Sequence, residues 1–194
     1  MSTGPTASSL IQLVHLYYPS GIEKEDPRYV ASEEARRLEA VLETHASGTS
    51  VWKSFIHQLL GAFANCSIWD TTVPHADPCY TCRVSLPGFV TGAPLYECVV
   101  CMVSQLAPVY ALYASHADKT KLPERDYWLR FPPFPVEFQS HEDKLVGLIE
   151  STFGFTRLSN EILFTPVPDL VPRTVNFGLG EARLIDCLLT EHRY

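Results

Sequence analysis

Apolar residues recur at helical spacing in three parts of the chain. The first part follows Ser32 and ends at Gly48, the second begins at Thr49 or Ser50, and the third follows Ser140. Serine and threonine are favoured N-cap residues, so the sequence predicts helices over residues 32–48, 50–63 and 140–154. The expected apolar faces are Ala35, Leu38, Val41 and Leu42 in the first helix, Val51, Phe55, Leu59, Leu60 and Phe63 in the second, and Leu145, Leu148, Ile149 and Phe153 in the third.

Shorter runs rich in β-branched and aromatic residues predict strands. These runs occupy residues 9–18, 66–72, 79–86, 96–105, 109–115, 161–167 and 182–189. Residues 87–94 contain two glycines and two prolines, which is typical of a hairpin loop. The order of elements predicts an α+β fold in one domain over residues 1–194. We expect a mostly antiparallel sheet flanked by about three helices, which form a single layer on one face.

The composition narrows the class of protein. The chain has 194 residues, 46% of them hydrophobic, and a net charge of −7. This charge argues against binding to nucleic acid or to an anionic membrane surface, since both require a basic face. No stretch reaches the roughly 18 apolar residues of a membrane span. If the charge identifies a partner, that partner is cationic.

Four cysteines form two CxxC pairs. Cys79 and Cys82 are followed, after fifteen residues, by Cys98 and Cys101, a separation that occurs in zinc ribbons. Both pairs, however, lie in predicted strands without the turn residues that would curl a chain around a metal. Side chains three positions apart on a strand point to opposite faces, so we expect four buried core residues and no metal site.

The amino terminus bears on the state of these thiols. Residues 1–9 lack the basic and apolar regions of a secretory leader. We therefore expect a cytoplasmic protein in which all six cysteines are reduced.

Motifs of common enzyme classes are missing from the sequence. Gly178-Leu-Gly180 begins like a dinucleotide-binding loop, but Arg183 stands where the third glycine is required. The seven histidines are scattered singly, and Asp186-Cys187 lies in an apolar run. A Cys–His nucleophile pair could be formed by several combinations, and the sequence favours none of them. We expect that the chain is not an enzyme and that it needs no cofactor. We also expect that it has no catalytic, cofactor-binding or metal-binding residue.

Three clusters of aromatic residues are candidate binding anchors, since tyrosine and tryptophan combine a large apolar area with a polar group. The alternative is that they cover the edge of the sheet. The clusters are residues 17–19, 126–128 and 131–134. Acidic residues also gather at positions 23–26, where they could face a cationic partner.

Several segments together resemble the immunity proteins of bacterial polymorphic toxin systems. They are Trp52 with Phe55, Leu106-Ala-Pro-Val-Tyr110-Ala-Leu-Tyr113, Phe153-Gly154-Phe155 and Asp186-Cys187-Leu-Leu. The resemblance extends over most of the chain and implies a small cytosolic α+β protein that binds and occludes a cognate toxin. Such toxins are often cationic nucleases. It assigns no binding residue to a position in this chain.

Two functions are therefore favoured, and an uncharacterised enzyme is a third alternative. The first is an immunity protein that neutralises a cognate toxin without catalysis. The alternative is a small zinc-stabilised or redox-sensitive cytosolic protein that uses Cys79, Cys82, Cys98 and Cys101. The sequence does not indicate the oligomeric state, the toxin or the interface.

Overall fold

The computed structural model describes residues 4–87, 95–118, 126–173 and 177–189. The helices are α1 (Ala7–Val14), α2 (Pro27–Ala31), α3 (Glu33–His45), α4 (Ser50–Ala62), α5 (Val136–Phe153), α6 (Asn160–Leu163) and α7 (Leu184–Leu188). The strands are β1 (Ile68–Asp70), β2 (Cys79–Ser85), β3 (Leu95–Ser104), β4 (Val109–Asp118), β5 (Asp126–Arg130) and β6 (Thr156–Arg157).

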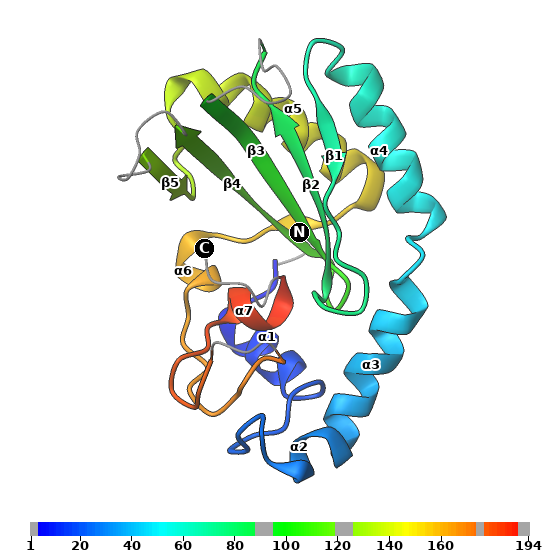
Figure 1. The fold of residues 1–194 in the computed structure, drawn as a ribbon, viewed down its shortest axis with the longest axis vertical. Coiled ribbons are helices and arrows are strands. Elements are labelled where there is room, and N and C mark those ends of the chain that lie inside the picture. The colour runs from blue at the N-terminus through cyan, green and yellow to red at the C-terminus, as the bar shows by residue number, and fades with distance from the viewer. Residues whose placement is uncertain (1–3, 88–94, 119–125, 174–176, 190–194) are drawn as a thin grey trace.

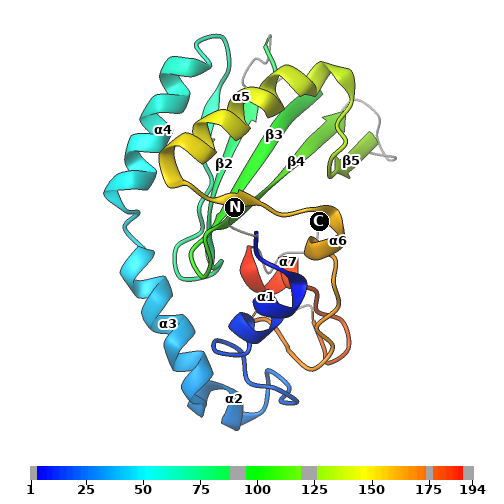
Figure 2. The same ribbon diagram turned by 180° about the vertical axis from the view of Figure 1, so that it is seen from behind.

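The sheet is an antiparallel meander in the order β1-β2-β3-β4-β5, and β6 adds a short parallel pairing with β4. This arrangement confirms the predicted α+β fold. In Figure 1, α5 passes behind the strands, and Figure 2 shows the same helix in front of them. Helices α4 and α5 cover this face of the sheet.

The core under α4 and α5 is rich in aromatic rings. Trp52 stacks on Tyr80 with ring centroids 4.9 Å apart, and it also contacts Phe55 and Phe153. The indole Nε1 of Trp52 donates a hydrogen bond to a carboxylate oxygen of Asp70 at 2.9 Å. Trp52 therefore connects α4 to the edge strand β1, to β2 and to the end of α5.

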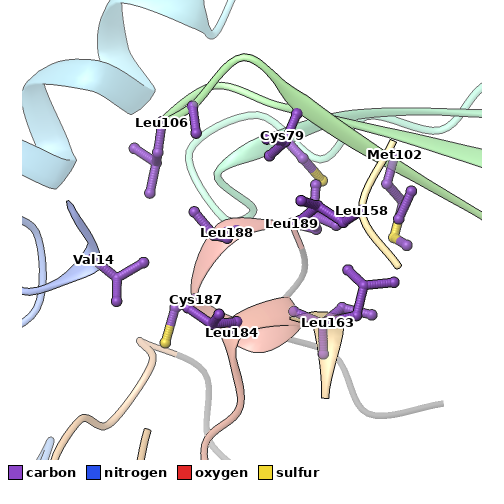
Figure 3. Close-up of a cluster of buried hydrophobic side chains, with 14 of the residues drawn as sticks. Val14, Cys79, Met102, Leu106, Leu158, Leu163, Leu184, Cys187, Leu188 and Leu189 are labelled. Atoms are coloured by element: carbon purple, nitrogen blue, oxygen red, sulfur yellow. The ribbon is translucent and has the colours of Figure 1, made fainter. Parts of the chain in front are cut away.

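A second core joins the other elements to one end of the sheet. Helices α1, α3, α6 and α7 lie beyond the lower ends of the strands in Figure 1. Figure 3 shows Leu184 and Leu188 of α7 between Val14 of α1 and the strand residues Cys79 and Met102. The hydroxyl of Ser104 donates a hydrogen bond to the Leu188 carbonyl at 2.8 Å, so this contact is polar as well as apolar.

The prediction of a strand over residues 9–18 is wrong, because this segment contains α1. Thr6 and Ser9 form a reciprocal capping box that starts the helix. Leu10 and Val14 are one helical turn apart and bury the same face. Their apolar neighbours Ile11 and Leu13 are half-buried, which is why the sequence pattern resembles that of a strand.

The two strands predicted near the carboxyl end are also wrong. Residues 161–167 contain part of α6, and residues 182–189 contain α7. A single bridge between Pro166 and Arg183 is the pairing that the structure describes between the two segments. All five residues of α7 are buried, so the segment has no polar face. A short apolar run of this kind cannot be assigned to a helix or a strand from periodicity.

The three predicted helices are present, with two differences in detail. Ser32 and Thr49 cap α3 and α4 as expected, but α5 begins at Val136 and not after Ser140. In α4, Trp52 belongs to the buried face, whereas Val51 and Leu60 are exposed. The prediction also missed β5, and the hairpin loop expected at residues 87–94 lies outside the described residues except for Pro87.

An ionic contact joins the end of α1 to a distant loop. The two ring nitrogens of His15 lie 2.7 Å from the Ile11 carbonyl and 2.8 Å from a carboxylate oxygen of Asp169. Both partners are acceptors, so both nitrogens donate and the ring is an imidazolium. Burial lowers the pKa of His15, but these hydrogen bonds outweigh it and the pKa is raised. Asp169 also accepts a hydrogen bond from Ser20 at 2.6 Å.

We predict that the contribution of this contact to stability depends on pH. Since the pKa of folded His15 is raised above 6.5, the contribution is complete below pH 6.5 and is lost as pH rises through the folded pKa. Replacing His15 with glutamine should cost up to about 1 kcal/mol at pH 6 and less at pH 8.5. Urea unfolding at both values measures the difference, with His57→Gln on the exposed face of α4 as the control. An equal loss at both pH values would contradict the prediction.

Candidate functional site

The four clustered cysteines do not converge on one point. Cys82 and Cys101 are paired directly across β2 and β3, on the face under α4 and α5. Cys79 and Cys98 belong to the opposite core and pair with Ser104 and Ser85. Ser104 is six positions after Cys98 on β3, which corresponds to about 20 Å along a strand. In this arrangement the four sulfur atoms cannot bind one ion.

The remaining described residues provide no other metal site. Nowhere in the described ranges are three or more His, Cys, Asp or Glu side chains placed to hold a metal ion. Of the four clustered cysteines, Cys82 and Cys101 are the pair that the strand register places next to each other, so a redox-sensitive function would use these two thiols. The Cys101 thiol and burial raise the pKa of the Cys82 thiol, and a protonated thiol without solvent contact reacts slowly.

We therefore predict that purified protein contains no stoichiometric zinc. Treatment with a chelator should leave the melting temperature unchanged, because structural zinc would contribute folding free energy directly. Elemental analysis and thermal unfolding with and without EDTA measure both quantities. One equivalent of zinc that is lost together with the folded structure would contradict this arrangement of the cysteines.

The structure brings together one Cys–His pair that the sequence did not favour. The Sγ atom of Cys66 lies 3.4 Å from Nε2 of His141 on α5, and the two residues are 75 positions apart. Burial raises the pKa of Cys66, and burial together with Lys144 lowers that of His141. These directions favour the neutral thiol and neutral imidazole over the ion pair that an activated nucleophile requires. Neither residue lines the cavity that is described below.

Asp186 and Cys187, which the sequence offered as a candidate catalytic pair, form hydrogen bonds that stabilise the fold. Asp186 accepts a hydrogen bond from the Arg183 backbone N–H at 2.9 Å and so helps to cap α7. The carbonyl of Cys187 accepts a hydrogen bond from the Tyr18 hydroxyl at 2.9 Å. Tyr18, from the aromatic cluster 17–19, is therefore a core residue.

The other two aromatic clusters also pack against the sheet or its neighbours. Trp128 on β5 stacks on His116 and contacts Phe138 of α5 edge to face. Phe131 contacts Tyr113 of β4, and Phe134 is buried against Phe138. The side chains of residues 126 and 127 lie outside the described residues.

A cavity of about 820 Å³ lies beside residues 132–134, the first half of α5 and the start of α6. We call it the acidic groove. Its charged residues are Glu142, Asp143, Arg157 and Glu161. Three carboxylates and one guanidinium group therefore line the groove, which has an excess of negative charge. The sequence had indicated parts of it, in the cluster 131–134 and in the acids Glu142 and Asp143, but not their proximity to residues 157–161.

Internal contacts fix the shape of the acidic groove. Arg157 forms an ion pair with Glu142 at 2.6 Å, and its guanidinium lies over the Phe134 ring. The side-chain amide of Asn160 donates a hydrogen bond to the Pro132 carbonyl at 2.6 Å, which holds α6 against the proline segment. Asp143 and Glu161 are exposed at the groove, where they can contact a cationic side chain of another molecule.

The acidic segment 23–26 is less suited than the acidic groove to bind a cationic partner. Asp26 caps α2 and forms an ion pair with Arg28 at 2.6 Å, so its charge is balanced locally. Glu23 accepts a hydrogen bond from the Leu179 backbone N–H at 3.3 Å. Two of the acids in this segment therefore have partners within the chain.

Comparison of the chain with protein-family models, with characterised proteins and with solved structures finds no match. Among the residues that the structure describes, no helix combines the length and the apolar character that crossing a bilayer requires.

Proposed function

We propose that this chain is an immunity protein, which binds a cognate toxin in the bacterial cytoplasm and neutralises it by occlusion, without catalysis. The toxin would be a cationic domain, such as a nuclease. The acidic groove is the observation that best supports this proposal. It is a cavity with a volume of about 820 Å³, and three carboxylates, two prolines and one phenylalanine are among its lining residues.

The groove and the net charge of −7 would act at different stages of binding. The net charge attracts a cationic domain over a distance, and such steering raises association rates by about 10- to 1,000-fold at low salt. At contact, Asp143 and Glu161 would pair with basic side chains of the toxin. Removing these two charges should therefore slow association and weaken its dependence on ionic strength.

The proposal is tested by co-expression with the candidate toxin, which an adjacent gene would encode. Cells that produce the toxin and this chain at matched levels should grow, and cells with the toxin alone should die. Inhibition should leave the toxin covalently unchanged in mass spectrometry. Death of the co-expressing cells, with the chain soluble and folded, would overturn the proposal.

A pair of double variants locates the interface. Asp143→Asn with Glu161→Gln removes two charges from the groove but keeps the Glu142–Arg157 ion pair. Glu39→Gln with Glu43→Gln removes two charges from exposed positions on α3. We expect at least about tenfold slower association for the groove variant at low salt, and no more than about a twofold change for the α3 variant. Equal rates for both variants would place the interface elsewhere.

A further inference from the structure

One of the six cysteines differs from the others in its exposure. Five are buried: Cys79, Cys82, Cys98, Cys101 and Cys187. Cys66 is half-buried in the turn that follows α4, and its backbone N–H donates a hydrogen bond to the Phe63 carbonyl at 2.9 Å. A reagent must contact the sulfur to react with it, so Cys66 is the thiol that small molecules can reach in the folded chain.

The thiol of Cys66 contacts a histidine that is held in place by its neighbours. The Sγ atom lies 3.4 Å from Nε2 of His141, whose side chain is 7% exposed. The His141 ring stacks on Phe63 with ring centroids 5.5 Å apart, and its Nδ1 lies 3.4 Å from the hydroxyl of Ser140. Contacts on the ring face and at Nδ1 therefore keep Nε2 directed at the sulfur.

The imidazole of His141 is in the form that accepts a proton. Burial, together with Lys144, lowers its pKa, so the ring is mainly neutral at pH 7. Burial also raises the pKa of Cys66, and the resting pair is a thiol next to a neutral imidazole. When the sulfur forms a bond to another atom, Nε2 can take the thiol proton as a general base. The pair therefore combines a nucleophile with a proton acceptor at one accessible position.

Lys144 places a positive charge beside this pair. Its ammonium group donates a hydrogen bond to the Ala62 carbonyl at the end of α4 and lies 4.8 Å from the centre of the Phe63 ring. These contacts hold the ammonium group next to the turn that carries Cys66. Its charge lowers the pKa of Cys66, although the opposite effect of burial is larger. A cation in this position stabilises the thiolate that forms during a reaction.

We propose that Cys66 is a site of reversible thiolation by low-molecular-weight disulfides. The sulfur of Cys66 attacks one sulfur of the disulfide, so that a new S–S bond forms while the original S–S bond breaks. His141 takes the thiol proton and gives it to the departing thiolate. Cys66 is thereby oxidised, and the departing half of the disulfide is reduced to a thiol. A disulfide suits this site because the exchange requires a nucleophile and a proton acceptor, but no group that stabilises an oxyanion.

The neutral disulfide 4,4′-dithiodipyridine is the probe, since the absorbance of its departing half measures the reaction. We expect one thiol of the native chain to react at least about tenfold faster than the other five, and peptide mapping by mass spectrometry to place the adduct on Cys66. In urea all six thiols should react, and dithiothreitol should restore the original mass. The absence of a single fast thiol, or an adduct on another cysteine, would overturn the proposal.

His141→Gln tests the proton acceptor, because it keeps a polar side chain but removes the base. Reaction of Cys66 should slow at least about fivefold at pH 7, whereas His57→Gln on the exposed face of α4 should leave the rate unchanged. The native chain gives a second readout that needs no variant. Between pH 6.5 and 7.5 its rate should rise less than about tenfold, since His141 and not the solvent receives the proton. An unchanged rate in His141→Gln, or the full tenfold rise in the native chain, would overturn the proposal.

Discussion

Replacing Trp52 with alanine should lower the free energy of unfolding by about 3–5 kcal/mol. Trp52 is 1% exposed and is the largest fully buried side chain in the described core. The substitution leaves a cavity between α4, Tyr80 and Phe153, and it removes the hydrogen bond from the indole to Asp70. Urea unfolding followed by circular dichroism measures the loss, because this readout does not depend on tryptophan fluorescence.

Leu60→Ala is the control for this prediction. Leu60 lies on the same helix and is 53% exposed, so its replacement should change the free energy of unfolding by no more than about 0.5 kcal/mol. A loss of less than about 1 kcal/mol for Trp52→Ala would show that the core beneath α4 is not packed as described.

Replacing Leu184 with alanine should cost about 2–5 kcal/mol. Leu184 is fully buried in α7, and its backbone N–H donates to the Thr165 carbonyl at 3.0 Å. Because α7 lies between α1 and the end of the sheet, the cavity would weaken both contacts (Figure 3). Hydrogen exchange should show faster opening of α1 together with α7, and denaturant unfolding should give the total loss.

Leu179→Ala provides the comparison at an exposed site near α7. Its effect should stay within about 0.5 kcal/mol. If Leu184→Ala accelerated exchange in α7 but left α1 unchanged, the two helices would not form one cooperative unit. The packing in Figure 3 would then contribute little to the stability of α1.

The elements that the sequence predicted correctly are those whose structure is determined by residues nearby in the chain. Ser32 and Thr49 accept hydrogen bonds from backbone N–H groups in the first turns of α3 and α4, so the cap residue itself marks the start of each helix. The opposite orientation of Cys79 and Cys82 on β2 follows from the two-residue repeat of a strand, and so does that of Cys98 and Cys101 on β3. This repeat was sufficient to predict that the two cysteines of each CxxC motif would point to opposite faces of the sheet.

The elements predicted wrongly depend on contacts between distant segments. Helix α7 is buried on every side because α1 and the sheet enclose it, and no periodic pattern survives such burial. The acidic groove is likewise formed by tertiary packing, which places Arg157 against Glu142.

A hydrogen bond between residues 18 and 187 limits the order in which native contacts can form during synthesis. Tyr18 donates to the carbonyl of Cys187, which is 169 residues later in the chain. At roughly 5–20 residues per second, the ribosome supplies that partner about 8–34 s after Tyr18 itself. The sheet and helices α4 and α5 find their partners within residues 50–157 and can form during this interval. Helix α1, although it precedes the sheet in the chain, should be among the last elements to acquire its native contacts.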